Sequence, residues 1–158
     1  CTDPVLAARI KRNHRISQNS LGMIANEAAY SDGADWLDQL LPYIDSNHTL
    51  VENYLSEKLP SVGYTKAQGT YFGWLDFSNL INTIGAEKEA ILTQKSDDPK
   101  TPTQILEKWL VMNAKVQLNA GTSYGKGSET FMRMNLGTSK ANITHALDNI
   151  TQAITKIS

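Results

Sequence analysis

Apolar residues recur every three or four positions along much of the chain, a period that predicts amphipathic helices. The longest helix is expected from Ala34 to Lys58, with Pro42 kinking or breaking it and Pro60 following its end. Thr103 and Ser139 are expected to be N-caps of later helices. The remaining helical stretches are predicted over residues 3–16, 21–30, 79–91 (in part), 103–114 and from 139 onwards.

Alternation of apolar and polar residues predicts strands over residues 116–120 and 129–136, and a segment rich in aromatic residues predicts another over residues 71–77. In the last strand one face is apolar and is expected to pack on helices: Met132, Met134 and Leu136. The other face seals no core in this chain and carries Phe131, Arg133 and Asn135. The sequence therefore predicts an α+β fold, in which a small mixed or antiparallel sheet is covered on one face by helices and preceded by a long helix.

The composition narrows the class of protein. A chain of 158 residues suits one medium domain, or one domain with a remnant of another. The net charge of −1 gives no reason to expect nucleic acid or a membrane surface as a partner. Apolar stretches are too short to span a bilayer, and no leader pattern supports secretion. The single cysteine, Cys1, fits a reducing compartment, so we expect a cytoplasmic protein.

Two familiar kinds of site are not supported by the spacing of residues. The glycine-rich segment from Gly121 to Ser128 differs from a phosphate-binding loop, because three rather than four residues precede Gly-Lys and glycine follows the lysine. No metal site is expected, since His14, His48 and His145 have no second ligand at suitable spacing. We expect these histidines to be surface or capping residues.

Arg133 is the most informative side chain. The chain has four arginines, and the other three lie within the first fifteen residues. A guanidinium on a half-buried strand needs an acceptor, and its planar fork suits a carboxylate held by two hydrogen bonds. That carboxylate belongs either to this chain, with Asp76 as the candidate, or to a ligand. On spacing alone, a surface arginine or a salt bridge within the chain is favoured.

Several segments, taken in order, resemble the C-terminal part of fold-type-I aminotransferases, which depend on pyridoxal 5′-phosphate. Within that superfamily the sequences of these segments are similar to those of the cystathionine β-lyase (C–S lyase) branch typified by MalY and PatB. The resemblance extends over nearly the whole chain and rests on these segments: Ser20–Tyr30, Asp35–Leu41, Gly69-Thr-Tyr-Phe-Gly-Trp-Leu-Asp76, Val116–Gly125 and Glu129-Thr-Phe-Met-Arg-Met-Asn-Leu136.

The resemblance implies that Arg133 binds the α-carboxylate of an amino-acid substrate, at a cleft edged by the loop Gly121–Gly127. Residues 1–33 would be a two-helix remnant of the large domain, and residues 34–158 the small C-terminal domain. The family's Schiff-base lysine lies upstream of all the matched segments, and Lys11 falls in the helix that follows it. The chain alone is therefore expected neither to bind the cofactor covalently nor to turn over substrate.

The activity implied for the complete enzyme is β-elimination from a sulfur amino acid, and the enzyme is expected to be a homodimer. An amino-acid aminotransferase of the same superfamily is the first alternative. A free-standing α+β binding module without catalysis is the second. The family usually has phenylalanine where this chain has Tyr124, and we assign Tyr124 no chemical role at this stage.

Overall fold

The computed structural model describes residues 3–13 and 19–157, so predictions that fall on Cys1 and His14 lie outside the described residues. Contacts between residues divide the chain into two compact units, Cys1–Leu41 and Pro42–Ser158. The division falls inside α3 (Ala34–Lys58), one continuous helix that runs through Pro42 without a break. The domain boundary between residues 33 and 34 stays a prediction.

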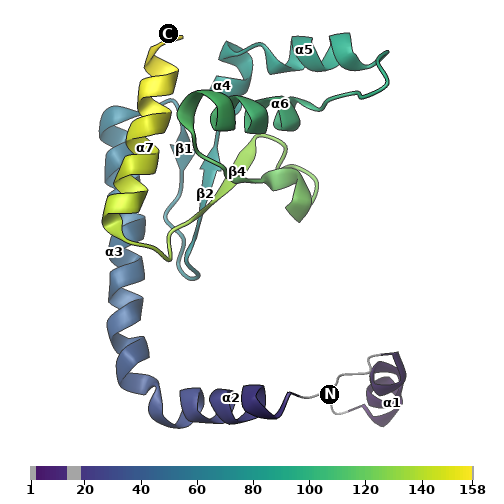
Figure 1. Ribbon diagram of the computed structural model, residues 1–158, viewed down its shortest axis with the longest axis vertical. Helices are drawn as coiled ribbons and strands as arrows, with labels where there is room; N and C mark the ends of the chain where they lie inside the picture. The colour runs from purple at the N-terminus through teal and green to yellow at the C-terminus, as the bar shows by residue number, and fades with distance from the viewer. Residues whose placement is uncertain (1–2, 14–18, 158) are drawn as a thin grey trace. The chain divides into compact units, whose positions relative to one another are not determined.

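The first unit consists of α1 (Pro4–Asn13), α2 (Ser20–Asp32) and the start of α3 (Figure 1). The Asp3 carboxylate accepts a hydrogen bond from the N–H of Val5 at 2.8 Å, which caps α1. Only Gly33 separates α2 from α3, and an added Cβ there would lie 2.3 Å from the carbonyl oxygen of Ala29. The whole of α2 is exposed within the described structure.

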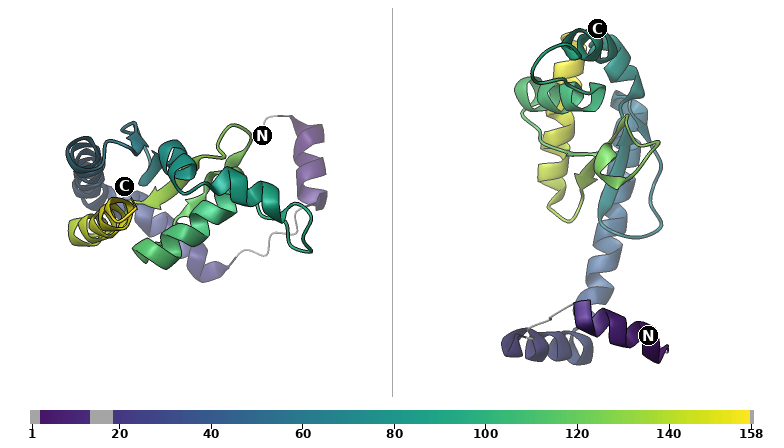
Figure 2. Two further views of the ribbon diagram at one scale, coloured as in Figure 1. Left: turned by 90° about the horizontal axis from the view of Figure 1, so that it is seen from above. Right: turned by 90° about the vertical axis from the view of Figure 1, so that its right-hand side faces the viewer.

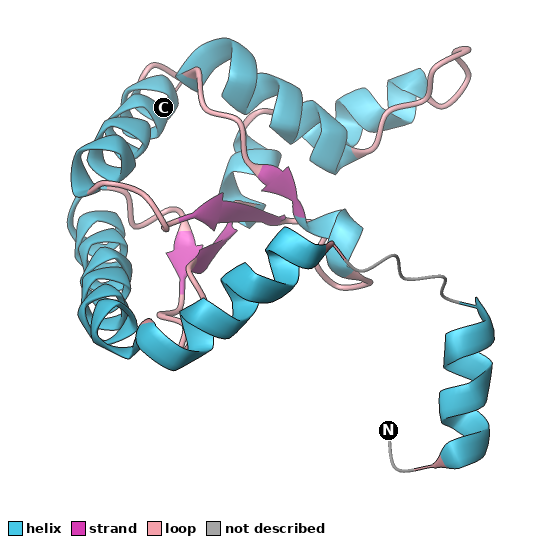
Figure 3. Cartoon of the chain, turned by 60° about the horizontal axis from the view of Figure 1, so that its bottom comes forward, coloured by secondary structure: helices cyan, strands magenta, loops and turns pink. Residues whose placement is uncertain are grey.

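The second unit is built on a four-stranded sheet with the order β1-β2-β4-β3, in which all neighbours are antiparallel. The strands are β1 (Gly63–Tyr64), β2 (Phe72–Asp76), β3 (Asn119–Ala120) and β4 (Phe131–Asn135). Figure 3 shows how short they are beside the helices. The predicted α+β class is confirmed, but β1 was not expected and the strand predicted over 116–120 is reduced to two residues.

The helices of this unit lie before β1, between β2 and β3, and after β4 along the chain. They are the second part of α3, α4 (Ser78–Thr83), α5 (Ala86–Thr93), α6 (Pro102–Trp109) with its π-helical continuation η1 (Leu110–Ala114), and α7 (Lys140–Thr155). The last turns of α3 lie beside α7 (Figures 1 and 2), where the Tyr54 hydroxyl donates a hydrogen bond to the Asp148 carboxylate at 2.5 Å. Among the helices within the described ranges, none is long and apolar enough to cross a membrane.

The core lies between one face of the sheet and these helices. Met132, Met134 and Leu136 are at most 5% exposed, so the predicted apolar face of β4 is confirmed. The helices contribute Val51, Leu106, Ile143 and Leu147, each with no exposed surface. Alternation in β2 buries Gly73 and Leu75 on the same side. The opposite face, which carries Arg133, is therefore turned away from the core.

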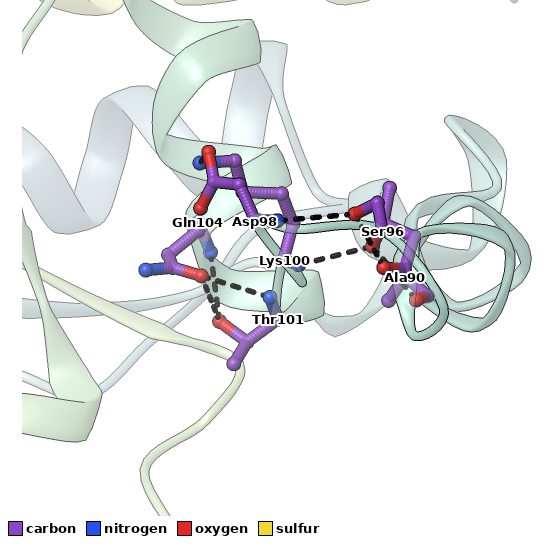
Figure 4. A network of polar contacts seen from close by, with 7 residues as sticks. Ala90, Ser96, Asp98, Lys100, Thr101 and Gln104 are labelled. Carbon is purple, nitrogen blue, oxygen red and sulfur yellow. Dashed lines mark hydrogen bonds and ion pairs between the residues drawn. The ribbon is translucent and has the colours of Figure 1, made fainter.

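The polar loop before α6 ends in a capping box (Figure 4). The Thr101 hydroxyl accepts a hydrogen bond from the Gln104 N–H, and the Gln104 side chain accepts one from the Thr101 N–H at 2.9 Å. The prediction that Thr103 is the N-cap is wrong, because Pro102 already occupies the first helical position. Thr103 is buried and donates its hydroxyl to the carbonyl oxygen of Glu129 at 2.6 Å, which ties α6 to the approach to β4. Ser139 caps α7 as predicted.

Candidate functional site

Arg133 stands at the centre of β4 on the face of the sheet that points away from the core. Its cross-strand neighbours are Trp74 in β2 and Asn119 in β3. The side chain is half-buried. Alternation along the strands places it beside side chains from β2 rather than beside the helices of the core.

Aromatic rings cover this outer face. The central carbon of the Arg133 guanidinium lies 4.0 Å from the ring centre of Phe72 and 5.0 Å from that of Tyr124. Trp74 stacks on Phe131 with ring centres 5.6 Å apart, and meets Tyr124 edge-on at 5.5 Å. Phe72, Trp74 and Phe131 thus share the outer face with Arg133, and the loop before β4 adds the ring of Tyr124.

The salt bridge to Asp76 is not formed. The Asp76 carboxylate instead accepts a hydrogen bond from the Ser78 N–H at 2.9 Å, at the start of α4. Among the residues that the structure describes, no carboxylate pairs with Arg133, and its buried Nε has no hydrogen-bond partner. A buried donor without an acceptor costs about 1–3 kcal/mol, more when charged. Arg133 thus keeps donors for an anion from outside the described chain.

The loop before β4 brings Tyr124 to the guanidinium. It begins with the 3-10 helix η2 (Gly121–Tyr124), and Ser128 closes it by donating its hydroxyl towards the carbonyl oxygens of Gly121 at 3.0 Å and Gly125 at 2.6 Å. The Gly127 N–H donates to the Glu129 carboxylate at 3.1 Å. Backbone hydrogen bonds, first its own and then that of Gly127, lower the pKa of Glu129 below 4.5.

The two histidines that the structure describes, His48 and His145, lie in α3 and α7. His145 is exposed, but His48 is only 2% exposed, so the prediction of a surface or capping residue is wrong for it. Its Nε2 lies 3.0 Å from the carbonyl oxygen of Thr70 and its Nδ1 lies 2.5 Å from the Tyr64 hydroxyl. Within the described residues, no three histidine, cysteine, aspartate or glutamate side chains gather closely enough to hold a metal ion.

The arrangement suits the binding of a planar anion. A guanidinium with rings against it offers its N–H groups at the edge, in the plane where a carboxylate can accept two parallel hydrogen bonds. The rings lower local hydration, which strengthens such a contact. The sequence identified Arg133 as a candidate but did not predict its contact with the ring of Tyr124. The available signal was an aromatic residue inside the glycine-punctuated loop that leads into the arginine's strand.

Comparison with known proteins finds relatives over nearly the whole chain, although no family model matches it. The chain is 36% identical over 148 residues to cystathionine β-lyase PatB of Bacillus subtilis, and this match covers 94% of the chain and 33% of PatB. It is 28% identical over 152 residues to MalY of Escherichia coli, covering 96% of this chain and 34% of MalY. The chain thus spans about a third of the length of these curated relatives.

Solved structures likewise match nearly the whole of this chain and about a third of their own length. A putative aminotransferase from Clostridium difficile with pyridoxal phosphate bound superposes with a TM-score of 0.73 at 32% identity, over 95% of this chain and 34% of the other. Cystalysin from Treponema denticola, which contains pyridoxal 5′-phosphate, superposes with a TM-score of 0.79 at 22% identity, over 99% and 36% respectively. The predicted fold is therefore that of a part of these larger proteins.

Proposed function

Since the chain belongs to the family of cystathionine β-lyases of the PatB and MalY type, we propose that it is part of a pyridoxal-phosphate-dependent C–S lyase and binds the substrate's α-carboxylate through Arg133. The observation that carries the proposal is the guanidinium itself. It is half-buried among rings, no described carboxylate pairs with it, and its Nε lacks an acceptor. A substrate carboxylate would supply the missing acceptor.

The outer face of the sheet does not by itself fit the cofactor. Among the described residues, no lysine is hydrogen bonded to, paired with or stacked on Arg133 or the rings around it, so an amine for a Schiff base is not offered there. Pyridoxal phosphate supplies an electron sink for carbanion chemistry. In our proposal, residues outside this chain hold it, and this chain contributes binding and orientation of the substrate.

The wider assignments belong to the same proposal. We place the complete enzyme in the cytoplasm as a homodimer, with residues 1–33 joining its large domain and residues 34–158 forming its small domain. The support is the family match over about a third of the relatives' length. Size-exclusion chromatography of the complete enzyme with light scattering tests the dimer.

The decisive experiment replaces Arg133 by lysine in the complete enzyme. Lysine keeps the charge but loses the two-pronged donor geometry. We expect kcat/KM for cystathionine to fall at least about tenfold, which corresponds to about 1.4 kcal/mol of transition-state stabilisation. Lys88→Arg, the reverse exchange on the exposed surface of α5, is the matched control and should leave the kinetics within twofold. Unchanged kinetics in a folded Arg133→Lys enzyme would remove Arg133 from the site.

The products decide between the two enzyme classes. Release of pyruvate, ammonia and homocysteine without an added keto acid identifies the lyase. Dependence on a keto-acid acceptor identifies an aminotransferase, a class represented among the structural relatives. Absence of both activities in the folded complete protein would support a non-catalytic binding module.

A further inference from the structure

The contact between Tyr124 and Arg133 is not explained by packing of the core. Tyr124 is 50% exposed, and its ring gives up contact with water to lie against a cation and the edge of Trp74. Phe72 touches the same guanidinium from β2. Two rings from separate elements therefore restrict how the Arg133 side chain can turn, since a guanidinium is held over ring faces by cation–π attraction.

The backbone around Tyr124 is built to hold that ring in place. Gly121, where the loop begins, has no room for a side chain, because an added Cβ would lie 2.1 Å from the carbonyl oxygen of Ser128 and 2.6 Å from that of Phe131. Such close backbone approach is available only to glycine. The Ser128 hydroxyl then joins both ends of the turn through Gly121 and Gly125. The loop closes on itself and directs Tyr124 towards β4.

The ring rather than the hydroxyl makes the contact. Within the described part of the chain, the Tyr124 hydroxyl has no hydrogen-bond partner, whereas the ring contacts both Arg133 and Trp74. Trp74 is fixed in turn by stacking on Phe131, at an angle of 13° between ring planes. Phe131, Trp74 and Tyr124 thus form a row of three rings in contact that ends at the guanidinium.

We propose that Tyr124 is a positioning residue, which orients the guanidinium of Arg133 so that its edge meets the substrate carboxylate. This inference rests on the proposed function, because it concerns the same carboxylate. A tyrosine or phenylalanine ring at position 124 fulfils the role, and an aliphatic side chain of similar size does not. The effect is expected on substrate binding, because the ring acts through the guanidinium against which it lies.

The test compares Tyr124→Leu and Tyr124→Phe with the unchanged complete enzyme. Tyr124→Leu is expected to raise KM for the amino-acid substrate about fivefold, which converts to about 1 kcal/mol, with kcat within twofold. Tyr124→Phe should restore the original KM. The matched control is Tyr43→Leu, because Tyr43 also lies against a cation, Lys140 at 5.8 Å, but does not contact Arg133. This control should leave KM unchanged.

A second readout separates positioning from general structural damage. The inhibition constant of a non-reactive amino acid is measured alongside that of its carboxamide, which lacks the charged carboxylate. Tyr124→Leu should weaken binding of the acid about fivefold and of the amide less than twofold. Equal weakening of both would overturn the inference, as would a loss greater than fivefold in Tyr124→Phe, which keeps the ring.

The outcomes also separate this inference from the proposed function. If Arg133→Lys lowers kcat/KM while Tyr124→Leu changes neither KM nor the inhibition constants, Arg133 remains the carboxylate clamp and the positioning role of Tyr124 is refuted. If Arg133→Lys has no effect, the proposed function itself fails. Thermal unfolding of each variant, followed by circular dichroism, establishes that the compared enzymes are folded.

Discussion

The buried pair His48 and Tyr64 provides a sharp test of how the approach to β2 is held. A backbone carbonyl can only accept, so Nε2 of His48 carries the proton and donates to Thr70, and Nδ1 accepts from the Tyr64 hydroxyl. Thr70 has a positive φ of 67°, which is unusual for a residue with a branched side chain. Two residues later lies Phe72, the ring beneath Arg133. The His48 network therefore supports the chain segment that leads into β2 and to the ring of Phe72.

The expected loss of unfolding free energy depends on which polar groups each variant leaves without a hydrogen-bond partner. Tyr64→Phe removes one hydrogen bond and leaves Nδ1 of a ring that is 2% exposed without a donor, so we expect a loss of about 1–2 kcal/mol. His48→Phe removes both hydrogen bonds, but Thr70 is exposed and its carbonyl oxygen can accept a hydrogen bond from water instead. We therefore expect the free energy of unfolding to fall by about 2–3 kcal/mol. The double variant should lose about 1 kcal/mol less than the sum, because the shared hydrogen bond is counted twice.

Urea unfolding of the four proteins, followed by tryptophan fluorescence, measures these free energies. Tyr71→Phe is the control, since the Tyr71 hydroxyl has no partner among the described residues and its removal should change stability by less than about 0.5 kcal/mol. Additivity of the two single changes within about 0.3 kcal/mol would refute the coupling. A Tyr64→Phe variant as stable as the control would refute the contribution of the His48–Tyr64 hydrogen bond to stability.

Two further predictions concern ionisation. Burial, followed by the charge of Glu52, raises the pKa of Tyr64 from 10.0 to about 12. The contribution of the protonated hydroxyl to stability is therefore fully present below pH 10 and is lost as the pH rises through 12. Absorbance at 295 nm should show this tyrosine titrating at a higher pH than an ordinary tyrosine, and Tyr64→Phe should remove that step. The lowered pKa of Glu129 has the opposite sign, so the hydrogen bond to Gly127 supports the loop above pH 4.5 and is lost as the pH falls through the lowered value. Glu129→Gln should abolish this acid dependence of amide exchange in the loop, and an unchanged profile would contradict the assignment.

Local patterns were sufficient for much of the fold. The helix from Ala34 to Lys58 has its predicted ends, because apolar spacing and the following proline act within a few residues of the chain. The buried face of β4 was predicted because side chains alternate regardless of what covers them. By contrast, β1 contains two residues, too few to show a period. It forms because Gly63 and Tyr64 pair with β2, a contact that no local pattern encodes.

The site was predictable only in part. Arg133 was identified by its isolation on a strand, yet its partners could not be derived from spacing. Phe72 is brought there by pairing of β2 with β4, and Tyr124 by the path of a closed loop. The burial of His48 was missed for a related reason, since Thr70 and Tyr64 reach it from segments 22 and 16 residues away in the sequence. Contacts of this kind depend on the assembled sheet.

The two rings against Arg133 also have an evolutionary consequence. Under the proposed function, positions 72, 124 and 133 would be selected together, because a ring at 72 or 124 would contribute to carboxylate binding only while a guanidinium lies between them. Among homologues we expect tyrosine and phenylalanine to exchange freely at position 124 wherever arginine is retained at 133. In lineages that have lost the arginine, the aromatic requirement at 124 should relax, whereas the glycine at 121 should persist for as long as the loop keeps its path.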